Sequence, residues 1–542
     1  MKNILLYLTL ITLFSTSVFS QTAEEYYNRG NEKYYLQDYI GAISDYNKAI
    51  ELNPNYVDAY NNRGNTKSNL QDYSGAIADC NKAIELNPNL VDAYNNRGNA
   101  KNKLQDYTGA IADYDKAIEL NPNYAEAYNN RGVAKEVLQD YTDAMADYNK
   151  AIELDPNYAD AYINRGNAKK NLQDYRGAIS DYDKAIKLNP NYADAYYNRG
   201  NAKSDLQDYS GAIDDCNKAI ELNPNFGEAY FNRGIAKLNL GNNSGAISDY
   251  NKAIELNPNY AEAYYNRGLA KGNIQDYRGA IADCNKAIEL NPNDADAYIN
   301  RGASKFHLQD YSGAISDDNK AIELNPNYAD AYINRGASKF HLQDYSGAIA
   351  DNNKAIELNP NLVDAYNNRG NAKNKLQDYT GATADYDKAI ELNPNYADAY
   401  IGRGTVKKNL QDYTGAIADY DKAIEINPND AGAYYNRGNA KYDLQDYRGA
   451  IADDNKAIEL DPNYADAYNN RGNAKANLQD YRGAISDYNK AININPNDAV
   501  AYNNRAHAKY LLKDKNGACL DWSKAGELGY MPAYDNIKEN CN

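Results

Sequence analysis

Hydrophobic and polar positions follow a helical spacing along most of this chain, and the pattern repeats. In residues 91–124, small and aromatic side chains recur every three to four residues, first over 91–104 and again over 108–120. A polar turn separates the two stretches, with Asp106 placed to cap the second helix, and Pro122 ends the unit. Asn123 followed by Glu126 has capping-box spacing for the next helix. Each unit is therefore predicted to be a helix hairpin.

The unit returns with a period of 34 residues. An Arg-Gly pair marks the same place in each copy, from Gly30 to Gly472, and Ala506 holds the fifteenth place. A fixed period of this length indicates stacked supersecondary units. We expect an all-α array of about fifteen helix hairpins over residues 21–532, followed by a C-terminal capping helix over 531–542. The repeats begin at residues 23, 57, 91, 125, 159, 193, 227, 261, 295, 329, 363, 397, 431, 465 and 499.

The first 20 residues stand outside the pattern. Lys2 precedes an apolar run over residues 4–14, and Val18 and Ser20 have the spacing of a cleavage site. We interpret residues 1–20 as a signal peptide that is cut before Gln21; the alternative is an uncleaved membrane anchor. No later segment is apolar enough to cross a membrane. We expect a bacterial protein that is exported to the periplasm, to the cell surface or into the medium.

The glycine of each repeat lies inside the first helix, where it costs about 1 kcal/mol relative to Ala. Its recurrence indicates a steric need. We expect Gly98 to let the two helices of its hairpin approach, with Ala110 and Ala117 as the small residues opposite.

An arginine on the first helix and an aspartate on the second recur together, as in Arg97 and Asp113. Because a partly buried charge needs a partner, we predict an ion pair within each hairpin. The alternative is two separately solvated charges.

Net charge and residue types exclude several functions. The formal charge is -17, a typical repeat contributes about one negative charge to it, and no basic stripe is present, so nucleic acid is not an expected partner. Three histidines support little catalysis, and His307 and His341 lack further ligands at suitable spacing for a metal. No phosphate loop, nucleophile elbow or His-Glu-x-x-His motif occurs. We expect no enzyme activity, no cofactor and no metal.

The five cysteines form two groups. Cys80, Cys216 and Cys284 replace a tyrosine of the second helix in separate repeats and are expected to be small buried residues. Cys519 and Cys541 belong to the last hairpin and the capping helix, and an exported protein can join such a pair by a disulfide.

Other repeats depart from the pattern at the same position of the second helix or at the turn. Polar residues there suggest looser or hydrated joints at Asp318, Asn352 and Asp454. In repeat seven, the replacement of the usual turn by residues 241–243 suggests a bend.

The 34-residue unit resembles the tetratricopeptide repeat, whose pattern combines a glycine in the first helix, two alanines and an aromatic residue in the second, and a proline at the end. Glycine, both alanines and proline match in position, whereas Tyr, Arg and Lys replace the family's aromatic, Leu and Tyr. The matching and departing residues in repeat three are Tyr94, Arg97, Gly98, Lys101, Ala110, Tyr114, Ala117 and Pro122. The resemblance implies an α–α superhelix whose first helices line a concave, ligand-binding face.

Two sets of residues are predicted to face a ligand there. A recurring asparagine can pair with the backbone of an extended peptide; alternatively, it bridges adjacent repeats. This set is Asn62, Asn96, Asn130, Asn164, Asn198, Asn232, Asn266, Asn300 and Asn334. In repeats seven to ten the inward positions turn apolar, which indicates a binding patch or, alternatively, packing between first helices. This set is Phe231, Ile235, Leu238, Tyr265, Leu269, Ile299, Phe306, Ile333 and Phe340.

The sequence therefore predicts a non-catalytic scaffold that holds a protein or an extended peptide outside the cytoplasm. A repeat protein that binds glycans or cell-wall material is the alternative, and a structural spacer without a ligand is a third possibility. Acidic residues near the start of almost every first helix favour a basic or neutral ligand over a carboxylate.

Overall fold

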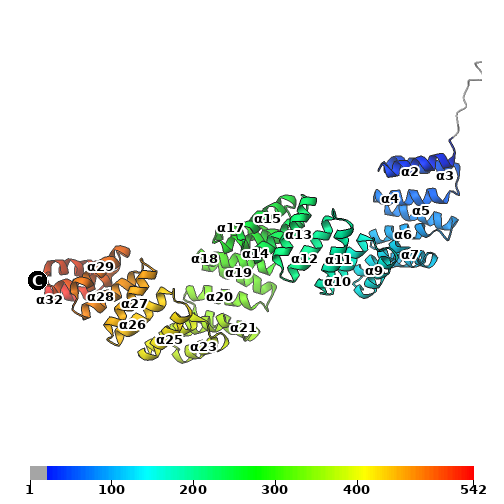
Figure 1. Cartoon of the computed structure of the whole chain (residues 1–542). Helices are drawn as coiled ribbons and strands as arrows, with labels where there is room; N and C mark the ends of the chain where they lie inside the picture. The colour runs from blue at the N-terminus through cyan, green and yellow to red at the C-terminus, as the bar shows by residue number, and fades with distance from the viewer. Residues whose placement is uncertain (1–20, 542) are drawn as a thin grey trace, which may run out of the picture. The chain divides into compact units, whose positions relative to one another are not determined.

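The computed structural model describes residues 21–541, and all of its regular elements are α-helices (Figure 1). The predicted signal peptide, residues 1–20, lies outside the described residues. The chain divides into two compact units, and the division falls within one helix, between Asn266 and Arg267. In the described range, no helix combines the length and the apolar character needed to cross a membrane.

The first unit runs from the N-terminal hairpin to the dividing helix. Its helices are α2 (Ala23–Tyr35), α3 (Tyr39–Leu52), α4 (Val57–Asn69), α5 (Tyr73–Leu86), α6 (Val91–Lys103), α7 (Tyr107–Leu120), α8 (Ala125–Val137), α9 (Tyr141–Leu154), α10 (Ala159–Asn171), α11 (Tyr175–Leu188), α12 (Ala193–Asp205), α13 (Tyr209–Leu222), α14 (Gly227–Asn239), α15 (Asn243–Leu256) and α16 (Ala261–Asn273).

The second unit holds the remaining hairpins and the terminal helix. Its helices are α17 (Tyr277–Leu290), α18 (Ala295–His307), α19 (Tyr311–Leu324), α20 (Ala329–His341), α21 (Tyr345–Leu358), α22 (Val363–Lys375), α23 (Tyr379–Leu392), α24 (Ala397–Asn409), α25 (Tyr413–Ile426), α26 (Ala431–Asp443), α27 (Tyr447–Leu460), α28 (Ala465–Asn477), α29 (Tyr481–Ile494), α30 (Ala499–Leu511), α31 (Lys515–Glu527) and α32 (Pro532–Asn540).

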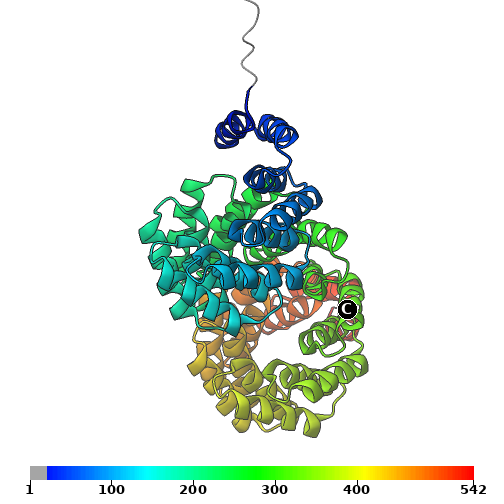
Figure 2. The same cartoon turned by 90° about the vertical axis from the view of Figure 1, so that its right-hand side faces the viewer.

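Each repeat is a hairpin of two helices that lie side by side, as the first hairpin, α2 and α3, shows in Figure 2. The turn between the helices places a glutamine in the left-handed region, as at Gln105 with φ 64°. Asp106 then caps the second helix, because its Oδ1 accepts a hydrogen bond from the backbone N–H of Gly109 at 2.9 Å. This part of the repeat agrees with the sequence prediction.

The predicted cap of the following first helix is wrong. Helix α8 has Tyr124 at its N-cap position and no side-chain cap. Asn123 lies one residue earlier, where its backbone N–H donates to Oδ1 of Asn121 at 3.1 Å and closes the turn between repeats. Where an aspartate replaces that tyrosine, it does cap the helix, as Asp294 does for α18.

The recurring glycine makes room for a tyrosine ring. A Cβ on Gly98 would lie 2.6 Å from Cε1 of Tyr114, which is fully buried in the second helix of the same hairpin. Ala110 and Ala117, which we expected to make this contact, are also fully buried and pack elsewhere in the core. The steric need is therefore real, but a ring creates it.

The expected bend in repeat seven is wrong as well. Gly241 has φ 76°, close to the value of the glutamine in the other turns. Asn242 takes the place of the capping aspartate, and its Oδ1 accepts from the N–H of Gly245 at 3.0 Å. The turn keeps its geometry, and glycine adopts this left-handed conformation without the steric cost that a side chain adds.

At the C-terminus, α32 covers the end of the last hairpin. Trp522 and Ala533 are fully buried in a cluster that the terminal helix completes. A disulfide joins Cys519 in α31 to Cys541, which follows α32, with the two Cα atoms 5.8 Å apart. This is the pair of cysteines for which the sequence suggested a bridge.

Candidate binding site on the first helices

We call the surface made by the first helices of successive hairpins the first-helix face. Both predicted residue sets lie on these helices, and all of their members are half-buried. The amides of the asparagine set make contacts that differ along the array.

Asparagine side chains near the start of the array connect consecutive first helices. Nδ2 of Asn130 donates to Oδ1 of Asn95 and of Asn99 in the preceding repeat, both at 3.1 Å. Oδ1 of Asn99 also accepts from the hydroxyl of Tyr114 at 2.8 Å. These bonds fit the alternative in which asparagine bridges repeats. Bonds to the preceding repeat are made by Asn62, Asn96, Asn130, Asn164 and Asn232.

The other members of the set do not form this ladder. Asn266 donates to the carbonyl of Glu262 in its own helix. Nδ2 of Asn300 is buried without a partner among the described residues. Their role towards a ligand stays a prediction.

In the first unit, the predicted apolar residues are partly committed to packing. The ring of Phe231 lies 5.8 Å from that of Tyr250 and 4.7 Å from that of Tyr260, measured between centroids. Ile235 lines a cavity of about 340 Å³, where Cys216 stands in place of the usual tyrosine. Leu238 and Tyr265 are half-buried.

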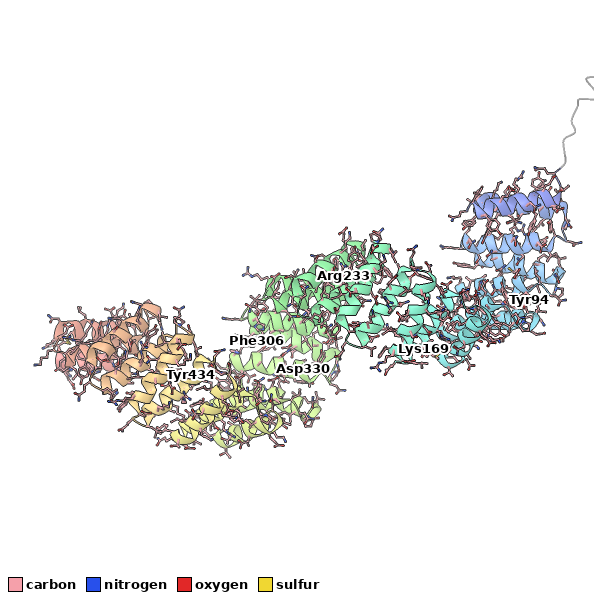
Figure 3. The ribbon with its side chains drawn as sticks, in the orientation of Figure 1. Tyr94, Lys169, Arg233, Phe306, Asp330 and Tyr434 are labelled. Atoms are coloured by element: carbon pink, nitrogen blue, oxygen red, sulfur yellow. A yellow bond between two sulfur atoms is a disulfide. The ribbon has the colours of Figure 1, made fainter. Side chains whose placement is uncertain are left out.

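In the second unit, the predicted residues separate into two groups. Ile333 packs against the core around Tyr332 and Ala355, and Leu269 and Ile299 are half-buried. Phe306 and Phe340, in contrast, line cavities (Figure 3 marks Phe306 on α18).

Two cavities lie one repeat apart on the first-helix face of the second unit. The cavity between α18 and α20 measures about 200 Å³ and includes Phe306, His307, Asp318 and Asn334. The next cavity measures about 230 Å³ and includes Phe306 again, with Phe340, His341 and Asn368. Phe306 therefore contributes to both.

The sequence of repeats nine and ten explains the first cavity. In most repeats, a tyrosine from the second helix fills the space under the first helices, as Tyr114 does. Repeats nine and ten carry Asp318 and Asn352 at this position, so the ring is missing. They also carry Ala303 and Ala337 where the partner asparagine, such as Asn99, normally stands. Loss of both large side chains leaves room between consecutive first helices.

Histidines mark the rim of these cavities. His307 stacks on Tyr277 of the preceding repeat with ring centroids 4.6 Å apart, and His341 stacks on Tyr311 at 4.8 Å. Both histidines are exposed. The stacks hold the C-terminal ends of α18 and α20 against the neighbouring hairpins and so support the walls beside Phe306.

The predicted Arg–Asp pair is confirmed and is part of a larger network. Asp113 is 4% exposed and accepts bonds from Nε and Nη2 of Arg97 at 3.0 and 2.5 Å, and Lys101 lies 2.7 Å away. Nη1 of Arg97 donates to Oδ1 of Asn81 in the preceding repeat at 2.7 Å. The arginine therefore joins two hairpins, and separately solvated charges are excluded in this repeat.

Sequence reasoning missed the bond from this arginine to the preceding repeat. Its signal is the Asn or Asp that directly follows the packed tyrosine position, as in Asn81 and Asp115. Arg131 pairs with Asp115 at 2.6 Å. The acidic side chains at the start of most first helices, such as exposed Asp330, add to the negative charge of the chain.

The two buried aspartates at the tyrosine position differ in their surroundings. Burial raises the pKa of Asp318 to about 8, and neither of its oxygens has a hydrogen-bond partner among the described residues. Burial raises the pKa of Asp454 to about 7, and Nδ2 of Asn470 donates to both of its oxygens at 3.2 and 3.1 Å. Asp318, Asn352 and Asp454 are fully buried, whereas the sequence suggested loose, hydrated joints.

The remaining cysteines offer no reactive site. Cys80, Cys216 and Cys284 are buried and unpaired, and burial raises the pKa of each thiol to about 12. Over residues 21–541, no cluster of three or more His, Cys, Asp or Glu side chains is arranged to hold a metal ion.

Comparison with family models identifies the repeat. A model described as tetratricopeptide repeat matches residues 57–90, 125–158, 193–226, 261–294, 329–362, 363–396 and 465–498. A second, described as TPR repeat, matches 30–71, 98–136, 171–207, 238–275, 406–445 and 438–479. A third, again tetratricopeptide repeat, matches 80–112, 147–180 and 216–248. The chain is a tetratricopeptide repeat protein.

Solved structures similar to this tetratricopeptide repeat chain come from several proteins. YrrB, described as a TPR protein with an unusual peptide-binding site, is 30% identical over 34% of this chain and 95% of its own, with a TM-score of 0.31. Cut9 with Hcn1, from the APC/C, is 16% identical over 84% of this chain and 96% of its own, at 0.43. Yeast Tom70 is 20% identical over 84% and 96%, at 0.39. No curated protein sequence matches this chain.

Proposed function

We propose that this tetratricopeptide repeat protein is a non-catalytic scaffold that binds an extended polypeptide on its first-helix face, outside the cytoplasm. The observation that carries the proposal is the pair of aromatic-walled cavities at Phe306 and Phe340. They recur one repeat apart, so a single extended chain can place side chains in both. Aromatic anchors in partly desolvated pockets tend to dominate the energy of such interfaces.

Backbone recognition would come from the same face. Cavities between first helices accept side chains, and the half-buried amides beside them, such as Asn334 and Asn368, offer donors and acceptors for peptide groups. The acidic surroundings favour a neutral or basic segment over an acidic one. This combination suits a polypeptide better than a nucleic acid, whose phosphates the net charge of -17 repels.

Export is part of the proposal. Residues 1–20 have the order of features of a signal peptide. The disulfide between Cys519 and Cys541 supports an oxidising compartment, where such bonds persist. Intact mass of protein recovered from the cell envelope or medium tests this: a chain beginning at Gln21 is expected, and a chain retaining residues 1–20 favours the anchor.

Substitution of both phenylalanines by serine tests the binding site. The variant Phe306→Ser with Phe340→Ser and the unchanged chain are applied to arrays of extended peptides and of glycans. We expect the unchanged chain to bind peptides and the variant to lose at least tenfold in affinity. A matched control is Leu308→Ser with Leu342→Ser, because these residues are 43% and 49% exposed on the same helix ends and line neither cavity.

The stability of the double variant shows whether the two phenylalanines belong to a binding site or to the core. If the phenylalanines serve binding, the double variant unfolds within about 0.5 kcal/mol of the unchanged chain, as surface substitutions do. Local melting of α18–α20 with undiminished peptide binding contradicts the proposed site. Binding to glycans and to no peptide would assign the face to carbohydrate instead.

A further inference from the structure

The cavity beside Phe306 contains a polar group that the scaffold does not satisfy. Asp318 is 0% exposed, and neither carboxylate oxygen has a hydrogen-bond donor among the described residues. Oγ of Ser338, which lines the same cavity, is also buried without a partner there. Buried polar groups are nearly always hydrogen-bonded, and an orphaned carboxylate is costly.

The cationic side chains near Asp318 are already paired with other aspartates. Arg301 and Lys305 bind Asp317, the neighbour of Asp318, at 2.6 and 2.8 Å. Arg335, from α20, binds Asp351 in α21 at 2.5 Å. The cations near the cavity therefore have other partners, and Asp318, which lines the cavity, is paired with none of them.

The equivalent aspartate of repeat thirteen shows how the scaffold can satisfy a carboxyl group at this position. Both oxygens of Asp454 accept hydrogen bonds from Asn470 of the next repeat. Asn334 occupies the place of Asn470 but makes no such bond to Asp318, and it lines the cavity. The same Asp and Asn side chains are therefore hydrogen-bonded to each other at repeat thirteen and are not bonded to each other at repeat nine.

We propose that the cavity between α18 and α20 binds the ammonium group of a lysine side chain, with Asp318 as its counter-ion. This inference rests on the proposed function, because the lysine belongs to the bound polypeptide. An ammonium has three donors and no acceptor, so once the side chains of Asp318 and Ser338 turn into the cavity, two donors can go to the oxygens of Asp318 and one to Oγ of Ser338. The ring of Phe306 lines the cavity, so it provides an apolar wall for the methylenes and an aromatic neighbour for the cation.

The size of the cavity fits this ligand. About 200 Å³ corresponds to between six and seven water-sized groups of about 30 Å³ each. A lysine side chain has four methylenes and one ammonium. The overall charge of -17 further favours a cationic ligand over an anionic one.

The cavity one repeat further along is a natural control. It has the same phenylalanine and histidine, in Phe340 and His341, but lacks a carboxylate. Asn352 stands at the position of Asp318, and its Nδ2 donates to the carbonyl of Ala348 in its own helix at 2.8 Å. We expect this second cavity to accept apolar side chains and to show no preference for lysine.

Proton release accompanies the binding that we propose. Burial, with the neighbouring Asp317 and Asp351, keeps the pKa of Asp318 at about 8, against a smaller lowering by Arg335. His307 is the other titratable group of the cavity. Near pH 7 the free site is therefore largely protonated, and an entering ammonium displaces that proton. Affinity for the ammonium should rise between pH 6 and pH 8.

The test uses the full mature chain and two fluorescent, end-blocked peptides of eight residues. One contains a single lysine among Gly, Ser and Asn, and the other has norleucine in its place. We expect the lysine peptide to bind at least tenfold more tightly at pH 8. Asp318→Asn should reduce it to the affinity of the norleucine peptide, and Asn352→Asp should add a second lysine-selective site.

A folding control comes from the repeat itself. Asp318→Tyr restores the residue that most repeats carry and fills the cavity, so it should abolish lysine selectivity while keeping the hairpin at least as stable. An unchanged ratio between the two peptides in Asp318→Asn overturns the proposal.

Titration with n-butylammonium separates this proposal from the proposed function. Protection of α18–α20 from hydrogen exchange by n-butylammonium, lost in Asp318→Asn, supports the cavity even if neither peptide binds, in which case the polypeptide function fails. Equal binding of both peptides without any effect of n-butylammonium leaves the polypeptide function standing and refutes the ammonium site.

Discussion

Removal of one buried carboxylate measures what the recurring ion network contributes. In Asp113→Asn the shape of the side chain is kept, but one oxygen becomes an NH₂ group. That group faces donors of Arg97 and Lys101, which lie 2.5 to 3.0 Å from the carboxylate oxygens. The variant therefore loses charge-assisted bonds and sets donors against each other. The hairpin of repeat three should become less stable.

The magnitude follows from burial. Breaking a fully buried pair costs about 3–5 kcal/mol. Asp113 is nearly fully buried, but the side chains of Arg97 and Lys101 are 19% and 22% exposed and can recover some hydration. We therefore expect a loss of about 2–3 kcal/mol. The neighbouring pair of Lys116 with Glu119 is exposed, so Lys116→Gln should cost about 0.5 kcal/mol or less.

Hydrogen exchange is the suitable assay, because an array with contacts between neighbours opens locally and does not unfold in one step. At about 1.36 kcal/mol per tenfold, amides of α6 and α7 should lose protection by about 30- to 160-fold in Asp113→Asn and about twofold in Lys116→Gln. Repeat eleven differs from repeat three at a single residue, Thr383 for Ile111. Asp385→Asn should therefore reproduce the effect there and leave repeat three unchanged. Equal losses in Asp113→Asn and Lys116→Gln would refute the reasoning.

Three further predictions concern single features. Because burial raises the pKa of Asp318 to about 8, the folded state binds more protons than the unfolded state between about pH 4 and pH 8; protection of α18–α20 should fall as pH rises through this range, and Asp318→Asn should remove that slope. Gly241→Gln should reduce protection of α14 and α15 by about fivefold, since a side chain at positive φ costs about 1 kcal/mol; no change would contradict this. Denaturation without a reductant should expose three thiols, and five would exclude the bridge between Cys519 and Cys541.

The hairpins could be predicted from sequence because each position of the unit recurs in every repeat. A single atypical residue in one repeat therefore does not hide the periodicity. Gly98, for example, is informative only because its equivalents recur. The spacing predicts a cap at Asn123, but the backbone N–H of Asn123 donates to Oδ1 of Asn121, and the N-cap position falls one residue later, at Tyr124. Sequence spacing does not decide between such local alternatives.

The candidate site was only partly predictable. The replacement of the usual tyrosine by Asp318 is visible in the sequence. A cavity forms there because the other helix also has a small residue, Ala303, in place of the usual asparagine. Phe231 and Phe306 have the same apolar character, yet one packs between two tyrosine rings and the other lines cavities. Which of them is available depends on neighbours in adjacent repeats, and this information comes from packing.

The arginine that joins each hairpin to the one before it has a consequence for the gene. Arg131 bonds to an aspartate, Asp115, and Arg165 to an asparagine, Asn149, with the same geometry and with the partner 16 residues earlier. Either oxygen serves, so an arginine finds an acceptor in whichever repeat precedes it. Unequal crossing-over between the gene segments that encode two repeats would therefore remove or add whole hairpins without orphaning a single one of these guanidinium groups. Such a molecule can change its length from one generation to the next while every junction remains chemically complete.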